Sequence, residues 1–143
     1  MENQKKAYIA GVLTVYQRDM RPIYENIAKI CTEHNIFAHV PHLAGTDPYV
    51  DPEVTPKDVW EKNYHEVTAA NYVIAYVGQP SLGTGEELEM ARASNIPIIA
   101  WSFNGEKVSR MVTGNPGVKE IITIDNEADL YNRINEILKS YEQ

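Results

Sequence analysis

Residues 72–77 read Tyr-Val-Ile-Ala-Tyr-Val, and this run decides the fold class. It is continuous, apolar and rich in β-branched side chains, which is typical of a central strand covered on both faces. Gly78–Gly85 is predicted to form a turn after this strand, and Glu86–Ser94 a short helix that ends before Pro97. A buried strand followed directly by a helix indicates a sheet with helices packed against it.

Strands and helices alternate outward from this central strand in both directions. Short apolar runs predict four more strands, and amphipathic periodicity predicts three more helices. The strands are expected over Ala7–Ala10, Ile36–Val40, Ile98–Trp101 and Val118–Ile124, and the helices from about Ile23 to His34, over Val59–Ala70 and over Ala128–Tyr141. Because crossovers between parallel strands are right-handed, this order predicts a single α/β domain over residues 1–143. We expect an open, mainly parallel five-stranded sheet with helices on both faces, of the Rossmann or flavodoxin type.

Composition places the chain among globular proteins and limits its partners. With 143 residues, 43% of them hydrophobic, the chain is long enough for one domain with its own core. Its 13 basic and 20 acidic residues give a net charge of −7, which argues against polymeric nucleic acid but admits one small anion. The apolar runs are far shorter than the roughly 20 residues of a membrane span. We expect a cytoplasmic protein with no signal peptide and no membrane partner, in which Cys31, the only cysteine, is a core residue.

No residue spacing predicts a metal site, and no cofactor is expected. His39 and His42 are three residues apart, but they flank Pro41 at the end of a strand rather than sharing a helix face. The chain has no His-Glu-x-x-His motif and no Cys/His ligand spacing. We expect His39 within the strand and His42 at the rim of a pocket.

The segments that follow the strands are where a site is expected. In open parallel sheets, ligands bind outside the carboxyl ends of the strands, near a switch in strand order. These ends are Gly11–Leu13, the proline-rich loop Pro41–Pro56, Gly78–Gly85 and Ser102–Gly105. Gly83 and Gly85 would let the backbone approach a ligand closely, Ser81 adds a hydroxyl, and the helix amino terminus can hold an anion. Glu87 is predicted to lie in the first turn, pointing into the crevice, although the helix dipole favours an acidic residue there without any functional role.

Three motifs, taken together, resemble a known enzyme superfamily. Tyr8–Gly11 reads Tyr-Ile-Ala-Gly, Pro80–Leu88 reads Pro-Ser-Leu-Gly-Thr-Gly-Glu-Glu-Leu, and Ser109–Gly114 reads Ser-Arg-Met-Val-Thr-Gly. These motifs, in this order, resemble those of the nucleoside 2-deoxyribosyltransferase superfamily and, within it, those of the 2′-deoxynucleoside 5′-phosphate N-hydrolases. The resemblance extends over roughly residues 7 to 114, and the middle motif is the most specific of the three.

The resemblance implies roles for individual residues. Glu87 corresponds to the nucleophile that attacks the anomeric carbon, and Tyr8 to a tyrosine beside it. Ser81 and Gly83 correspond to residues that hold a 5′-phosphate, and Gly11 and Gly85 are assigned with them to substrate binding. Ser109 corresponds to a serine that reaches the phosphate from a neighbouring subunit, which implies a homodimer. The chemistry agrees with the residue types, because a carboxylate below the sugar can stabilise or capture an oxocarbenium-like centre.

The chain departs from the family pattern at two places. Asn63 stands where the family has an acid/base aspartate, and an amide can form hydrogen bonds but cannot donate a proton as an acid does. Nearby candidates for that role are Asp58, Glu61, His65 and Glu66. Val12-Leu13-Thr14 replaces the serine and arginine of the hydrolases, so the need for a 5′-phosphate stays open, with Arg18 and Arg21 as candidate replacements.

Three functions follow from these observations. The first is cleavage of the N-glycosidic bond of a (deoxy)nucleoside or its 5′-monophosphate, by hydrolysis or base exchange, with Glu87 as nucleophile and with Tyr8 and Asn63 in the catalytic set. The second is release of a cytokinin-type base from a nucleotide. It is suggested by Gly83-Thr84-Gly85-Glu86-Glu87, which is similar to the Gly-Thr-x-Glu-Glu motif of the lysine-decarboxylase-like phosphoribohydrolases. Those enzymes, however, have glycines where Ser81 and Leu82 stand. The third is a nucleotide-binding module with little turnover.

Overall fold

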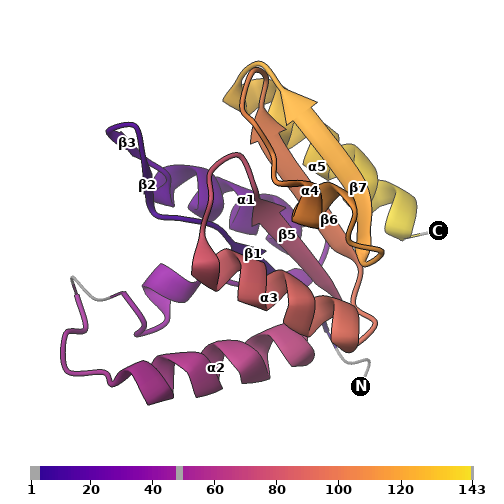
Figure 1. Ribbon diagram of the computed structural model, residues 1–143. Coiled ribbons are helices and arrows are strands. Elements are labelled where there is room, and N and C mark those ends of the chain that lie inside the picture. The colour runs from indigo at the N-terminus through magenta and orange to yellow at the C-terminus, as the bar shows by residue number, and fades with distance from the viewer. Residues whose placement is uncertain (1–3, 48–49, 143) are drawn as a thin grey trace.

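Five parallel strands form the centre of the molecule in the computed structural model, which describes residues 4–47 and 50–142 (Figure 1). In space the order is β4-β1-β5-β6-β7, and every neighbouring pair is parallel. The strands are β1 (Lys5–Ala10), β4 (Ile36–His39), β5 (Tyr72–Tyr76), β6 (Ile98–Phe103) and β7 (Val118–Ile124). The chain passes from β1 outward to β4 and then returns to the other side of β1 to form β5. The switch in strand order therefore lies at β1 and β5, and the predicted fold class is confirmed.

Helices cover both faces of the sheet (Figure 1). Helix α1 (Arg21–Glu33) packs beside α5 (Glu127–Tyr141), and α2 (Pro56–Thr68) packs beside α3 (Leu82–Ala93). Strand β5 is buried along its whole length, with alternate side chains in two separate core clusters. Tyr72, Ile74 and Tyr76 belong to the first cluster, and Val73 and Ala75 to the second. The predicted burial of this strand on both faces is thus confirmed.

Helix α3 begins four residues earlier than predicted. The Ser81 hydroxyl accepts a hydrogen bond from the Thr84 amide at 3.2 Å and so caps the helix at its amino terminus. Gly83 and Gly85 consequently lie inside the first turns of the helix rather than in the preceding turn, and Glu87 lies in the second turn rather than the first. Glycine is a weak helix former, and this obscured the start of the helix in the sequence.

Other boundaries move for similar local reasons. Thr55 caps α2 by accepting a hydrogen bond from the Asp58 amide, so this helix starts at Pro56 and ends at Thr68. Within the predicted loop Pro41–Pro56, residues Pro41–Leu43 form a 3₁₀ helix, and Pro48 lies outside the described residues. Strand β4 ends at His39, β6 continues to Phe103, and α5 starts at Glu127.

A small hairpin and a short helix were not predicted. Strands β2 (Thr14–Val15) and β3 (Arg18–Asp19) pair in antiparallel fashion beyond the carboxyl end of β1, and α4 (Arg110–Thr113) precedes β7 (Figure 1). The hairpin tip consists of Tyr16 and Gln17, both with positive φ. Such turns usually carry asparagine or glycine, so nothing in the sequence indicated this one.

Two further features of the fold concern single side chains. Cys31 is buried in the core on α1, as predicted, and burial raises its pKa to about 12. His34, just after α1, contacts Glu142 through Nδ1 at 2.6 Å and Asn135 through Nε2 at 2.7 Å. These contacts tie the end of α1 to the end of α5. Within residues 4–47 and 50–142, no helix has the length and apolar character needed to cross a membrane.

Candidate active site

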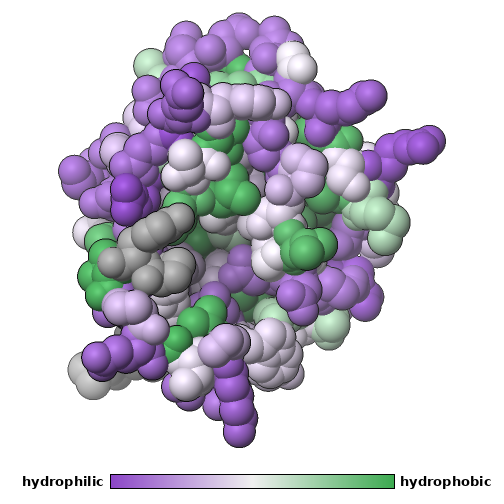
Figure 2. Space-filling view, turned by 60° about the vertical axis from the view of Figure 1, so that its left-hand side comes forward, coloured by the Kyte–Doolittle hydropathy of each residue, from purple (hydrophilic) through white to green (hydrophobic). Residues whose placement is uncertain are grey.

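A hollow in the described structure lies at the carboxyl ends of β1 and β5, where the strand order switches, and it extends between α2 and α3. It has a volume of about 540 Å³, within the range of small-molecule sites. Figure 2 shows this side of the molecule, with apolar side chains deep in a hollow that hydrophilic side chains surround. The residues of the predicted site that line it are Gly11, Asn63, Ser81, Gly83 and Glu87.

Glu87 extends from the second turn of α3 into this cavity. The phenol of Tyr8 donates a hydrogen bond to its Oε2 atom. The pKa of Glu87 is raised to about 7, chiefly by burial; the Tyr8 hydrogen bond lowers it and the nearby Glu86 raises it, and both effects are included in that value. Near neutral pH the group therefore exchanges between carboxylate and acid, which is the behaviour expected of a carboxyl group that takes part in chemistry.

Tyr8 supports Glu87 from behind the cavity wall. It lies in β1, is fully buried, and is not among the residues that line the cavity. Burial and the adjacent Glu87 carboxyl raise the pKa of the phenol, so Tyr8 keeps its proton and acts as a donor. Its ring stacks on that of His39, with centroids 5.4 Å apart, and the Nδ1 atom of His39 lies 3.6 Å from Glu66. The predicted pairing of Tyr8 with Glu87 is thus seen as a direct contact.

Asn63 lies on α2 and faces the same cavity. Its Oδ1 atom is buried and has no hydrogen-bond partner among residues 4–47 and 50–142. An unpaired buried acceptor is costly, so this amide is poised to bind a ligand that donates a hydrogen bond. None of the four candidates for an alternative acid, Asp58, Glu61, His65 and Glu66, lines the cavity. Glu66 instead lies beside His39.

The segment after β4 adds two polar groups, of which only His42 was expected near a pocket. His42 and Asp47 are both buried and both line the cavity. His42 Nε2 lies 3.3 Å from Glu25, and Asp47 lies 3.6 Å from Arg21. His42 was expected at the rim and is found in the wall. Asp47 gave no signal, because it lies in a proline-rich stretch without periodicity.

The residues expected to hold a phosphate are divided between two hollows. Ser81 and Gly83 line the main cavity, whereas Gly85 and Ser109 line a smaller neighbouring hollow of about 310 Å³. Ser81 borders both hollows, and Lys107 borders the smaller one. The Ser109 hydroxyl accepts a hydrogen bond from the Met111 amide, so it caps α4. The role of Ser109 in a partner subunit's site stays a prediction.

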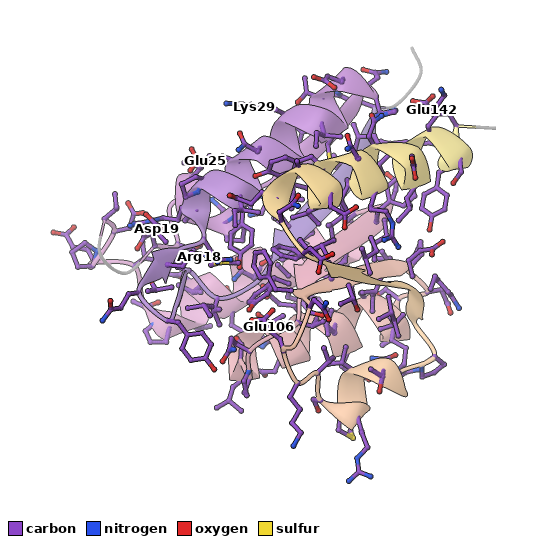
Figure 3. The ribbon with its side chains drawn as sticks, turned by 90° about the horizontal axis from the view of Figure 1, so that it is seen from above. Arg18, Asp19, Glu25, Lys29, Glu106 and Glu142 are labelled. Atoms are coloured by element: carbon purple, nitrogen blue, oxygen red, sulfur yellow. The ribbon has the colours of Figure 1, made fainter. Side chains whose placement is uncertain are left out.

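Neither arginine that was considered as a phosphate contact lines the main cavity. The guanidinium of Arg18 lies over the ring of Phe103, 4.3 Å from its centroid, and Figure 3 shows Arg18 on the hairpin. Arg21 pairs with Asp19 at 2.9 Å. Among the described residues, the lining of the main cavity contains three carboxyl groups, on Asp47, Glu86 and Glu87, and neither lysine nor arginine.

Gly11 is required where β1 meets the cavity. Its φ is +152°, and a Cβ atom at this position would lie 2.2 Å from the hydroxyl oxygen of Tyr24. That hydroxyl donates a hydrogen bond to the carbonyl of Val12 at 2.5 Å. Only glycine leaves room for this contact, which fixes the first turn after β1.

Within the described residues, no group of three His, Cys, Asp or Glu side chains is placed to hold a metal ion.

Sequence comparisons agree with the motifs. The sequence model of the nucleoside 2-deoxyribosyltransferase family matches residues 7–133. A candidate 2′-deoxynucleoside 5′-phosphate N-hydrolase of Syntrophotalea carbinolica is 38% identical over 65 residues, which span 44% of this chain and 46% of that protein. A protein of the same name from Thermofilum pendens is 28% identical over 114 residues, which span 76% of this chain and 77% of that protein.

Solved structures share the fold. A CMP N-glycosidase of Clostridium botulinum superposes with a TM-score of 0.64 at 16% identity, covering 92% of this chain and 99% of its own. A 2-deoxyribosyltransferase of Bacillus psychrosaccharolyticus superposes with a TM-score of 0.66 at 16% identity, covering 93% and 95%. At these identities the comparison establishes the architecture, and the chemistry has to be argued from the residues in the cavity.

Proposed function

The chain belongs to the nucleoside 2-deoxyribosyltransferase family, and from this premise we propose that it cleaves the N-glycosidic bond of a nucleoside with Glu87 as the nucleophile. Family membership makes it an enzyme of N-glycosidic bond cleavage or deoxyribosyl transfer. The observation that carries the assignment of Glu87 is its place in the cavity, where Tyr8 binds one carboxyl oxygen and burial raises the pKa to about 7.

The proposed reaction uses the two oxygens of Glu87 differently. Tyr8 binds Oε2, so Oε1 is the oxygen that attacks the anomeric carbon. The new C–O bond forms as the C–N bond breaks, and the base leaves with the electron pair of that bond. A water oxygen or a nitrogen of a second base then attacks the same carbon as the C–O bond to Glu87 breaks; Glu87 takes back the electron pair as carboxylate, and the proton of the attacking group passes to the departed base or to solvent. We propose hydrolysis as the main outcome, a choice that the names of the two sequence relatives support.

Departure of the base cannot be assisted here by an acid at position 63, where the family pattern has an aspartate and this chain has Asn63. The Asn63 amide can hydrogen-bond a base nitrogen or a sugar hydroxyl, but it cannot supply a proton. His42 and Asp47 line the same cavity, and their side chains can carry a proton as the missing aspartate would. We propose that Asn63 orients the substrate while one of these two groups or solvent protonates the base.

The charges in the cavity favour a substrate without a 5′-phosphate. Three carboxyl groups line it, and no lysine or arginine does so among the described residues, so a phosphate there would be repelled. The 5′-monophosphate is the second candidate, because Ser81 joins the cavity to the smaller hollow that Lys107 and Ser109 border. A phosphate placed in that hollow would meet a cation and two hydroxyl groups.

The test is release of free base. Purified protein is incubated with a panel of nucleosides, deoxynucleosides and their 5′-monophosphates, and products are separated by chromatography. Glu87→Ala is expected to abolish base release while leaving the far-UV circular dichroism unchanged. Addition of a second base distinguishes hydrolysis from exchange. Ligand binding by the wild type without base release, unchanged in Glu87→Ala, would instead establish a binding module.

We also propose that the protein acts as a homodimer with Ser109 at a shared site, as the family resemblance implies. Light scattering at micromolar concentration checks this. A monomer at that concentration would contradict the proposal for Ser109.

A further inference from the structure

Trp60 is a half-exposed aromatic residue at the cavity. It lies on α2, it is one of the residues that line the cavity, and 48% of its surface is accessible to solvent. Small-molecule sites are lined mainly by hydrophobic and aromatic side chains, so this placement fits a role in ligand binding. We propose that Trp60 is the platform on which the leaving nucleobase stacks, an inference that rests on the proposed N-glycosidase function.

A neighbouring ring holds the indole in place. Tyr64 stacks on Trp60 with centroids 5.0 Å apart and an interplanar angle of 9°. The two residues are four apart on α2, so they lie on one face of the helix. Tyr64 supports one face of the indole, and the platform is therefore ordered before any ligand binds. Such preorganisation reduces the entropy that binding costs.

The position of Trp60 relative to the polar groups fits a nucleoside. Asn63 lies one helical turn further along α2 and also lines the cavity, with its buried Oδ1 atom unpaired among the described residues. A base stacked on the indole would bring its polar edge towards this amide. Glu87 lies on α3, which packs beside α2, so the sugar would extend from the base towards the nucleophile.

Stacking on Trp60 would hold a nucleobase without hydrogen bonds that are specific to one base. Every nucleobase has a π face, and aromatic stacking tolerates a change of base better than hydrogen bonds do. Base–aromatic stacking contributes enough that Trp60→Ala should raise KM about 5- to 150-fold. Because the contact is made equally in the bound substrate and in the transition state, kcat should change little. Trp60→Phe keeps a smaller aromatic plane, so its KM should lie between those of the wild type and Trp60→Ala.

The fluorescence of Trp60 allows binding to be measured directly. The chain has two tryptophans, and the other one, Trp101, is fully buried. In the inactive variant Glu87→Ala, titration with deoxyadenosine should quench the emission of the exposed indole, whereas 2-deoxyribose should not. The double variant Glu87→Ala/Trp60→Phe should show no quenching. Tyr16→Ala is the matched control for kinetics, because this exposed aromatic residue does not line the cavity.

Two results would overturn the proposal. One is an unchanged KM in Trp60→Ala together with no quenching by deoxyadenosine, while the wild type still releases base. The other is emission that depends on protein concentration and not on nucleoside, which would assign the Trp60 face to contact with a second copy. If the wild type released no base but deoxyadenosine quenched Trp60, the proposed enzymatic function would fail and the platform would stand.

Discussion

Removing the phenol oxygen of Tyr8 tests the charge state of Glu87. In Tyr8→Phe the carboxylate loses a hydrogen bond that stabilises its charged form, while the buried ring and its stacking on His39 are kept. A hydrogen bond to a charged group is worth about 1.5–3 kcal/mol, which corresponds to a rise of about 1–2 units in the pKa of Glu87. From a starting value of about 7, the pKa would rise to about 8–9.

The expected loss of activity follows from this shift. At pH 7 the carboxylate fraction falls from about one half to between about 1% and 10%, so kcat/KM should fall roughly 5- to 50-fold. In wild type, activity should rise with pH through about 7, because Glu87, the proposed nucleophile, must be ionised. In Tyr8→Phe this rise of kcat/KM should occur at higher pH, and most of the lost activity should return once the pH exceeds the new pKa of Glu87.

The measurement is a pH profile of kcat/KM for base release, with Tyr24→Phe as the matched control. Tyr24 also lines the cavity, but its hydroxyl donates to the Val12 carbonyl rather than to Glu87. Its removal should leave the acidic limb where it is. A profile for Tyr8→Phe that is lower at every pH but not displaced would refute the reasoning, because it would show that the hydrogen bond does not control ionisation of Glu87.

Three further predictions concern stability. Glu87→Gln should have little effect at pH 5 and should stabilise the protein by up to about 3 kcal/mol at pH 8, as measured by urea unfolding. Because the pKa of Glu87 is raised in the folded protein, the wild type loses stability as pH rises through about 7, and the neutral amide of the variant would avoid that loss. An equal change in unfolding free energy at pH 5 and pH 8 would contradict this explanation. In the same urea unfolding experiment, Gly11→Ala should destabilise the protein by about 2–4 kcal/mol, because the new methyl group collides with the Tyr24 hydroxyl. Gly83→Ala, with open space at its Cβ, should be neutral or slightly stabilising. His34→Ala should cost about 1 kcal/mol at pH 5.5 and less at pH 8.5, because its two contacts raise the histidine pKa and favour the charged form; a pH-independent loss would exclude that origin.

The fold was predictable because its signals are local and regular. The run at 72–77 is buried on both faces as its composition indicated, and strand β7 has the predicted bounds Val118–Ile124. The start of α3 was not predictable from periodicity, because Gly83 and Gly85 suggest a turn while the Ser81 cap makes them helical. Capping hydrogen bonds decide such boundaries, and they are specified by single side chains.

The site was predictable only where a motif marked it. Tyr8 and Glu87 belong to the first two motifs, and the structure places them in contact. Asp47 and Trp60 were missed, because neither belongs to a motif and their proximity to Glu87 depends on how the segment after β4 folds back. An aromatic residue on an amphipathic helix has the same appearance in sequence whether it faces the core or a cavity.

The contact between Tyr8 and Glu87 also makes the proposed chemistry conditional on complete folding. The two residues are 79 positions apart, so no locally folded fragment contains both. In an unfolded chain Glu87 is a solvated glutamate that ionises at an ordinary pH and has no donor beside it. It becomes a buried group that titrates near neutrality only once β1 and α3 have docked on the same sheet. Opening either element returns it to an ordinary solvated carboxylate, so under the proposed mechanism a partly folded molecule would be inactive.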